Sequence, residues 1–188
     1  MISLPSPCLV VLVGAAGSGK TTLATRLFDS ASVLSSDAHR AIVRGDETDQ
    51  SATRTAFKIL HRRLERRLGD RATTVIDATN VTSYARRSLV RRATAAGMPS
   101  IAIVLDLDPV LVRARNATRG GRIVPEEVVD RQLGELERSL RTATIDEDGF
   151  AAIHIVRTAQ ELDELAIGWA AEVRPDRPSP AGRRSAGR

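Results

Sequence analysis

The chain has 188 residues, of which 42% are hydrophobic, and a formal net charge of +5. This length allows one domain with a hydrophobic core and excludes two domains of ordinary size. A single cysteine, Cys8, excludes an intramolecular disulfide, and the three histidines lack the spacing of a metal site. Because no apolar run is long enough to span a membrane, we expect one soluble, cytoplasmic domain.

Most of the positive charge lies at the C-terminal end. Residues 174–188 contain five arginines and one aspartate, so they carry +4, and residues 1–173 carry only +1. This tail is rich in Pro, Gly and Ser and shows no apolar periodicity, which predicts disorder. We therefore predict a structured domain over residues 1–173, in which any nucleic-acid groove must come from local clustering of basic residues.

Short β-rich runs alternate along the chain with amphipathic stretches. This alternation is typical of an α/β fold in which helices cover both faces of a parallel sheet. The predicted strands are Cys8–Val13, Val33–Ser35, Thr73–Ile76, Ile101–Leu105 and Ala151–Val156. The predicted helices are Thr22–Phe28, Ser51–Leu68, Ser83–Ala95, one that begins at Pro125 and continues to Leu140, and Glu161–Glu172.

The first predicted strand leads into GAAGSGKT, which has the GxxxxGK[ST] pattern of a phosphate-binding loop (P-loop). Its glycines allow consecutive N–H groups to point at a phosphate, and the following helix adds its N-terminal dipole. In this pattern Lys20 contacts the β- and γ-phosphates and the Thr21 hydroxyl binds magnesium. The residues expected to bind the nucleoside triphosphate are Gly14, Ala15, Ala16, Gly17, Ser18, Gly19, Lys20, Thr21 and Thr22.

Asp37 follows the second predicted strand in the stretch VLSSDAHR, and Arg40 lies one helical turn later. An aspartate at this place is a common helix cap. However, the carboxyl ends of parallel strands share one edge, so Asp37 should open onto the same crevice as the P-loop. There its carboxylate could accept the proton of an attacking hydroxyl, and Arg40 could hold the acceptor's phosphate or orient the carboxylate. A cap and a general base are compatible roles.

The third predicted strand ends in VIDATN, which places Asp77 and Asn80 at the same edge of the sheet. Asp77 could contact the magnesium shell through water. Alternatively, Asp77 and Asn80 could only shape the turn, because both residue types favour turns. The sequence leaves these two interpretations equally open.

Four arginines lie within ten residues that also contain Gly120 and Gly121: Arg113, Arg115, Arg119 and Arg122. Like charges on one short helix repel one another unless anions neutralise them. The cluster therefore favours a helical lid, at about residues 113–125, that closes over a triphosphate. For any single arginine, a solvated basic face is the alternative.

Several motifs resemble the kinase domain of bacterial polynucleotide kinase-phosphatases in order and spacing. They are VLVGAAGSGKTT, VLSSDAHRAIV, GDETDQSAT, VIDATNV, the segment from Arg115-Asn116 to Arg122, and EDGFAAIHIV. The resemblance covers about residues 8–156. It implies a P-loop kinase fold with a central parallel sheet of about five strands and an arginine-bearing lid. It also implies ATP and Mg²⁺ as cofactors and transfer of the γ-phosphate to a 5′-hydroxyl end of RNA or DNA.

The same resemblance implies roles for individual residues. Lys20 and Thr21 become the phosphate and magnesium residues, and Asp37 becomes the general base. The acceptor side and the lid are implied by further matches: Arg40 holds Asp37 and the acceptor's phosphate, Arg115, Arg119 and Arg122 are the lid arginines, and Gln50 and Val128 frame the terminal nucleobase.

Three functions remain open from the sequence. Arg40 and the DETDQ segment favour a polynucleotide 5′-kinase. The nearly neutral body favours a P-loop kinase that acts on a small-molecule, nucleotide or sugar hydroxyl. A nucleotide-binding partner protein with little turnover is the third, but the joint presence of Asp37, Lys20 and the lid arginines argues against it, because a binding module needs no base.

Overall fold

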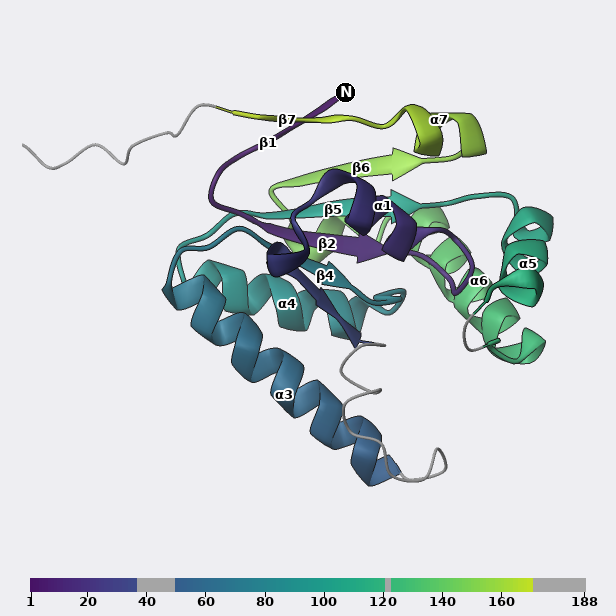
Figure 1. The fold of residues 1–188 in the computed structure, drawn as a ribbon, viewed down its shortest axis with the longest axis horizontal. Coiled ribbons are helices and arrows are strands. Elements are labelled where there is room, and N and C mark those ends of the chain that lie inside the picture. The colour runs from purple at the N-terminus through teal and green to yellow at the C-terminus, as the bar shows by residue number, and fades with distance from the viewer. Residues whose placement is uncertain (37–49, 121–122, 171–188) are drawn as a thin grey trace, which may run out of the picture.

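The computed structural model describes residues 1–36, 50–120 and 123–170. Their core is a five-stranded parallel sheet with the strand order β3-β4-β2-β5-β6 (Figure 1). The strands are β2 (Leu9–Val13), β3 (Val33–Ser35), β4 (Thr74–Asp77), β5 (Ser100–Leu105) and β6 (Ala152–Val156). All five predicted strands are confirmed, and their bounds differ from the prediction by at most one residue.

The central strand β2 is buried along its whole length because helices cover both faces of the sheet. Val10 and Leu12 pack into one cluster with Leu23 of the first helix, whereas Leu9 and Val11 pack into the opposite cluster. A strand that is buried on both faces has no polar side to alternate with. This explains why LVVLV is an uninterrupted apolar run and why this strand could be predicted from the sequence.

The predicted helices between the strands are also confirmed. They are α1 (Lys20–Leu27), α3 (Gln50–Gly69), α4 (Ser83–Ala95) and α6 (Glu126–Arg141). A further helix, α5 (Pro109–Thr118), lies between β5 and α6 in the chain. Local capping explains where two of them begin. The Thr82 hydroxyl accepts a hydrogen bond from the Ala85 N–H at the start of α4, and Asp108 caps α5 just before Pro109.

The predicted helix Glu161–Glu172 is wrong in its second half. Helix α7 spans only Ala159–Glu164 and begins at a capping box formed by Thr158 and Glu161. The chain then forms β7 (Ile167–Trp169), which pairs in parallel with β1 (Ile2–Leu4) in a separate two-stranded sheet. The Trp169 ring also lies edge-on to Phe28, with centroids 6.4 Å apart. These contacts with distant residues outweigh a helical periodicity that Gly168 already weakens.

The predicted disordered tail, residues 174–188, lies outside the described residues. Within the part of the chain that the structure describes, no helix combines the length and the apolar character needed to cross a membrane.

A buried ion pair anchors the loop that follows β4. The Arg86 side chain is fully buried, and its Nε donates to the Asp148 carboxylate at 2.5 Å. Its other nitrogens donate to the carbonyls of Asn80 and Val81 and, from α4 to α6, to the Ser139 hydroxyl. One guanidinium thus joins α4, α6, the turn at Asp148 and the VIDATN loop, so the loop geometry depends on this pair.

We expect Asp148→Ala to lower the free energy of unfolding by about 3 kcal/mol or more, because it leaves the Arg86 charge buried without its partner. The neighbouring substitution Glu147→Ala is the matched control. Glu147 is 69% exposed and lies 3.7 Å from Arg87, so its loss should cost under about 1 kcal/mol. Urea unfolding of both variants measures the difference. Equal losses would show that the buried pair is no more important than a surface pair.

Candidate functional site

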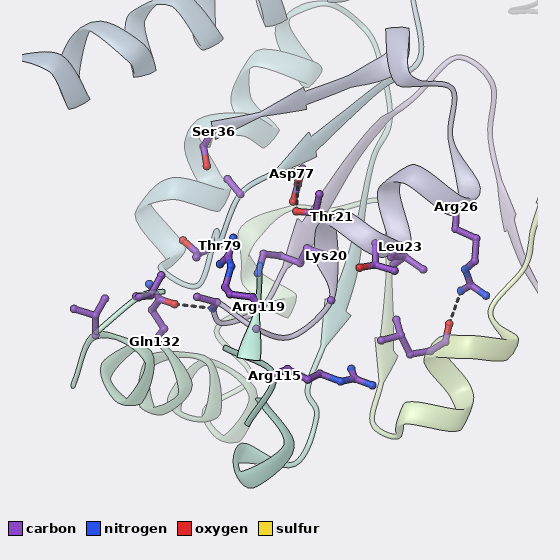
Figure 2. A pocket seen from close by; sticks show the side chains of 18 of the residues that line it. Lys20, Thr21, Leu23, Arg26, Ser36, Asp77, Thr79, Arg115, Arg119 and Gln132 are labelled. Atoms are coloured by element: carbon purple, nitrogen blue, oxygen red, sulfur yellow. Dashed lines mark hydrogen bonds between the residues drawn. The ribbon is translucent and has the colours of Figure 1, made fainter. Parts of the chain in front are cut away.

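A cleft of about 800 Å³ opens at the carboxyl edge of the sheet (Figure 2). The P-loop and the start of α1 form its floor, and Ser36 and residues 77–79 form one wall. The other walls come from α5 with Arg119, from the beginning of α6, and from α7. The parallel topology produces this convergence, because the strand ends that carry these loops all lie at one edge.

The P-loop adopts the conformation that its glycines allow. Gly17 and Gly19 have φ values of 88° and 97°, in the left-handed region that disfavours other residues. Gly19 is the N-cap of α1, and among the described residues no side chain caps the first N–H groups of this helix. The Lys20 ammonium lies beside the loop, 2.7 Å from the Ala15 carbonyl oxygen and 3.3 Å from Ser18 Oγ. The loop therefore combines backbone donors, a helix N-terminus and a cation.

The P-loop also packs directly against α5. A Cβ atom added to Gly17 would lie 2.4 Å from the Val112 carbonyl oxygen and 3.0 Å from the Asn116 nitrogen. Contacts this short leave no room for a side chain. The glycine is therefore required both by its positive φ and by the close approach of a second backbone.

The two predicted metal residues lie together. The Thr21 hydroxyl donates to Asp77 Oδ2 at 2.8 Å, and Asp77 is only 4% exposed. Hydroxyl and carboxylate oxygens are ligands that suit Mg²⁺, which is usually held by one or two carboxylates together with substrate phosphates. Among the described residues no three Cys, His, Asp or Glu side chains gather into a metal site. This donor set therefore fits a phosphate-bound Mg²⁺ and not an all-protein metal cage.

Asn80, in contrast, shapes the turn. It has a φ of 47°, and its buried amide donates to the Leu12 carbonyl of β2 at 2.8 Å. One residue earlier, the Thr79 carbonyl accepts a hydrogen bond from the Gly14 N–H at 2.9 Å. Residues of the VIDATN loop thus have different contacts. Asp77 faces the Thr21 hydroxyl, whereas Thr79 and Asn80 bind the loop to the P-loop and to β2.

The arginine cluster does not lie on a single helix. Arg115 lines the cleft from α5, and Arg119 lines it from the C-cap position just after this helix. Arg113 instead pairs with Asp130 of α6, with Nε 2.7 Å from Oδ1, and Arg122 lies outside the described residues. The repulsion expected between four arginines on one helix therefore does not arise. Two of the four arginines meet at the cleft.

Asn116 supports the arrangement of the cleft walls, a role that the sequence did not indicate. Its Nδ2 donates to the Val124 carbonyl at 2.8 Å, and its Oδ1 accepts from the Val124 N–H at 3.2 Å. This paired contact ties the last turn of α5 to Val124, two residues before α6, and Arg119 lies between these two residues in the sequence. An asparagine in the last turn of a helix gives no periodic signal, so only the fold reveals its role.

The wall formed by α7 was also missed. Arg26 of α1 donates to the carbonyls of Leu162 and Asp163 at the end of this short helix (Figure 2). A Cβ added to Gly19 would lie 3.1 Å from Leu162 Cδ2, so the α7 wall reaches the P-loop. The prediction of a longer helix over Glu161–Glu172 gave no reason to expect this contact between α7 and the P-loop.

The predicted acceptor-side residues are only partly described. Val128 lines the cleft from α6, and Ser36 lines it immediately before Asp37. Asp37 and Arg40 lie outside the described residues. Gln50 is the first residue of α3, but its side chain is likewise outside the described part.

Residues 9–140 match the family model described as the AAA domain. The chain belongs to the AAA domain family. Among solved structures, the Pnkp1/Rnl/Hen1 RNA repair complex matches with a TM-score of 0.62 and 23% identity, covering 74% of this chain and 47% of the other. The chain therefore spans about half the length of that relative. No curated protein matches the sequence.

Two further structures match this AAA domain over most of both chains. A sugar kinase from Janibacter sp. HTCC2649 has a TM-score of 0.54 and 18% identity, covering 85% of this chain and 87% of the other. A gluconokinase from Sinorhizobium meliloti 1021 has a TM-score of 0.55 and 20% identity, covering 86% and 88%. At these identities the similarity shows the fold, which is that of a P-loop kinase, as the sequence predicted.

We expect Gly17→Ala to weaken Mg²⁺-ATP binding at least tenfold and to lower the free energy of unfolding by about 2 kcal/mol or more. The added methyl group would force the loop away from α5, and alanine resists the positive φ. Gly134→Ala in α6 is the matched control, because a Cβ there has open space around it. That control should bind ATP normally and gain up to about 1 kcal/mol. Calorimetric titration and thermal unfolding test both variants. Normal ATP binding by Gly17→Ala would contradict the required close approach.

Proposed function

We propose that this protein is an ATP-dependent phosphotransferase that transfers the γ-phosphate of ATP to a 5′-hydroxyl end of RNA or DNA. The observation that carries the proposal is a single cleft lined by Lys20, the Thr21–Asp77 pair, and the arginines Arg115 and Arg119. A phosphoryl transfer needs these groups, because catalysis of this reaction is mostly positioning and charge stabilisation.

In this proposal the P-loop N–H groups and Lys20 hold the β- and γ-phosphates. Thr21 and Asp77 would hold Mg²⁺, which neutralises charge on the phosphate oxygens when bound. Arg115, Arg119 and Arg122 form the lid side of the site and stabilise the charge that the transferring group spreads over its oxygens. We assign residues 1–173 to this kinase domain and treat residues 174–188 as a separate tail.

The proposed step is a direct displacement at the γ-phosphorus. The Asp37 carboxylate takes the proton of the acceptor hydroxyl, whose oxygen forms a bond to the γ-phosphorus. The bond between this phosphorus and the bridging oxygen breaks, and the electron pair leaves with ADP. Arg40 orients Asp37 and the acceptor's phosphate, and Gln50 and Val128 frame the terminal nucleobase.

The motif resemblance supports a nucleic-acid end as the acceptor, in particular LSSD with an arginine three residues later, DETDQ and DATN. A small-molecule hydroxyl is the second candidate. It is favoured by the charge of only +1 over residues 1–173, because extended contact with nucleic acid usually needs a basic surface. Contact with one end and a few phosphates satisfies both observations.

One labelling experiment decides between the acceptors. The protein is incubated with Mg²⁺ and γ-labelled ATP, together with 5′-hydroxyl RNA and DNA oligonucleotides or with a panel of sugars, sugar acids and nucleosides. We expect the label on the 5′ end of an oligonucleotide. Label on a metabolite alone would replace the first candidate with the second, and ATP binding without any transfer would favour a low-turnover binding protein.

We expect Asp37→Asn to lower kcat by roughly 10²- to 10⁴-fold while changing the Kd for ATP less than about threefold. The amide keeps the capping ability of the carboxylate but cannot take a proton. Asp29→Asn is the matched control, because the Asp29 side chain accepts a hydrogen bond from the Ala31 N–H at 2.9 Å and caps a short 3₁₀ turn. Unchanged turnover in Asp37→Asn would leave Asp37 as a cap only.

A further inference from the structure

Gln132 joins helix α6 to the P-loop through a side-chain hydrogen bond. Its Oε1 accepts a hydrogen bond from the Ala16 N–H at 2.8 Å (Figure 2). The same side chain lines the cleft. None of the sequence motifs includes this residue, since it lies at an ordinary helical position six residues after the start of α6.

The contact with Ala16 fixes how the carboxamide is oriented. A backbone N–H can only donate, so the atom facing it must be the oxygen, and the NH₂ group must be on the other arm. Among the described residues this NH₂ group makes no hydrogen bond, and it is not a buried atom. Two N–H donors therefore remain available at a point where the side chain borders the cleft.

We propose that Gln132 is a catalytic residue that donates a hydrogen bond from Nε2 to an oxygen of the γ-phosphate of ATP. This inference rests on the proposed phosphotransferase function and adds one residue to its site. The oxygen of the same carboxamide holds the P-loop, so one side chain both shapes the loop and contacts the group that is transferred.

The position of Gln132 within the cleft favours the terminal phosphate. Figure 2 shows Gln132 and Thr79 on one side of the Lys20 side chain, with Arg26 on the other. Val128, one helical turn before Gln132, lines the cleft on the proposed acceptor side. The γ-phosphate is the phosphate nearest the acceptor, so a donor at the boundary between the P-loop and this side should meet its oxygens.

A neutral amide also suits the charges around it. Lys20, Arg115 and Arg119 already supply positive charge to the cleft, and Asp77 supplies the carboxylate that faces Thr21. An amide donates to a phosphate oxygen and leaves the net charge of the cleft unchanged. A glutamate at the same position would still accept the Ala16 N–H, but it would place a negative charge beside the phosphates.

Two substitutions separate donation by Nε2 from the contact between Oε1 and the Ala16 N–H, which we call the brace. Gln132→Glu keeps an acceptor for Ala16 but replaces the donor with a negative charge, and Gln132→Met removes the donor and the acceptor without adding a charge and with little change in volume. Calorimetric titration with Mg²⁺-ATP and Mg²⁺-ADP compares ligands that differ by the γ-phosphate. In both variants we expect the ratio of Kd for ATP to Kd for ADP to rise at least tenfold and kcat to fall at least a hundredfold. In Gln132→Met the Kd for ADP should stay within about threefold of the wild-type value.

Gln160→Glu is the matched control. Gln160 is exposed on α7 and donates to Glu164 at 2.8 Å, so the same change of chemistry should leave both dissociation constants and kcat unchanged. Melting temperatures show whether each variant is folded. If Gln132→Met does not fold, Gln132→Glu still tests whether this side chain faces the γ-phosphate, because it retains the bond to Ala16 and its charge would repel that phosphate.

The inference is overturned if Gln132→Glu keeps the wild-type ratio of ATP to ADP affinity, or if Gln132→Met weakens both nucleotides equally, because either result leaves Gln132 as a brace alone. Failure of the proposed function has a different signature. A wild-type protein that binds ATP but transfers no phosphate, with the ratio still changed in both variants, would keep the contact and reject the kinase. A wild-type protein that does not bind ATP would reject both.

Discussion

The geometry of the cleft depends on the close approach between the P-loop and α5 at Gly17. The loop leaves β2, which is buried on both faces and cannot shift, and it then lies against the Val112 carbonyl with no space for a side chain. Arg115 is three residues beyond Val112 on the same helix, so this contact also sets where its guanidinium enters the cleft. A backbone-to-backbone contact is stiffer than one through long side chains. The position of the P-loop and the position of Arg115 are therefore set by the same contact.

A second unit comes from the loop after β4. Asp77 accepts a hydrogen bond from Thr21, and the Thr79 carbonyl accepts one from Gly14. Asn80 donates to Leu12. Three of four consecutive residues therefore contact the P-loop motif or β2, the strand that precedes it. Arg86 supports this loop by donating to the carbonyls of Asn80 and Val81 while it pairs with Asp148. Burying such a pair adds little net stability. Its consequence here is geometric, because it holds the backbone at Asn80 and Val81, where the loop that begins with Asp77 ends.

The parts of this fold that the sequence revealed are those with a local or periodic cause. LVVLV is recognisable because both faces of β2 are buried, and GAAGSGKT because each glycine and the lysine answer a local requirement. The meeting of Thr21 with Asp77 was also predictable, since neighbouring parallel strands end at one edge of the sheet. Asn116 and Gln132 were not predictable, because their partners are Val124 and Ala16 and nothing in either local sequence marks those contacts. The wrong helix at Glu161–Glu172 has the same origin: Ile167 pairs with Ile2, almost the whole chain away.

The charge of the cleft differs from the charge of the domain around it. Residues 1–173 carry only +1, yet the described lining of the cleft has four basic side chains, Lys20, Arg26, Arg115 and Arg119, against two acidic ones, Asp77 and Asp163. This excess suits a polyphosphate whose charge is partly neutralised by a metal ion. A field confined to a cleft attracts such a ligand strongly but attracts a long polyanion weakly, because each phosphate farther along the strand meets little net charge. Under the proposed function, recognition should therefore be directed at the end of the acceptor, where the hydroxyl is, and not at its length.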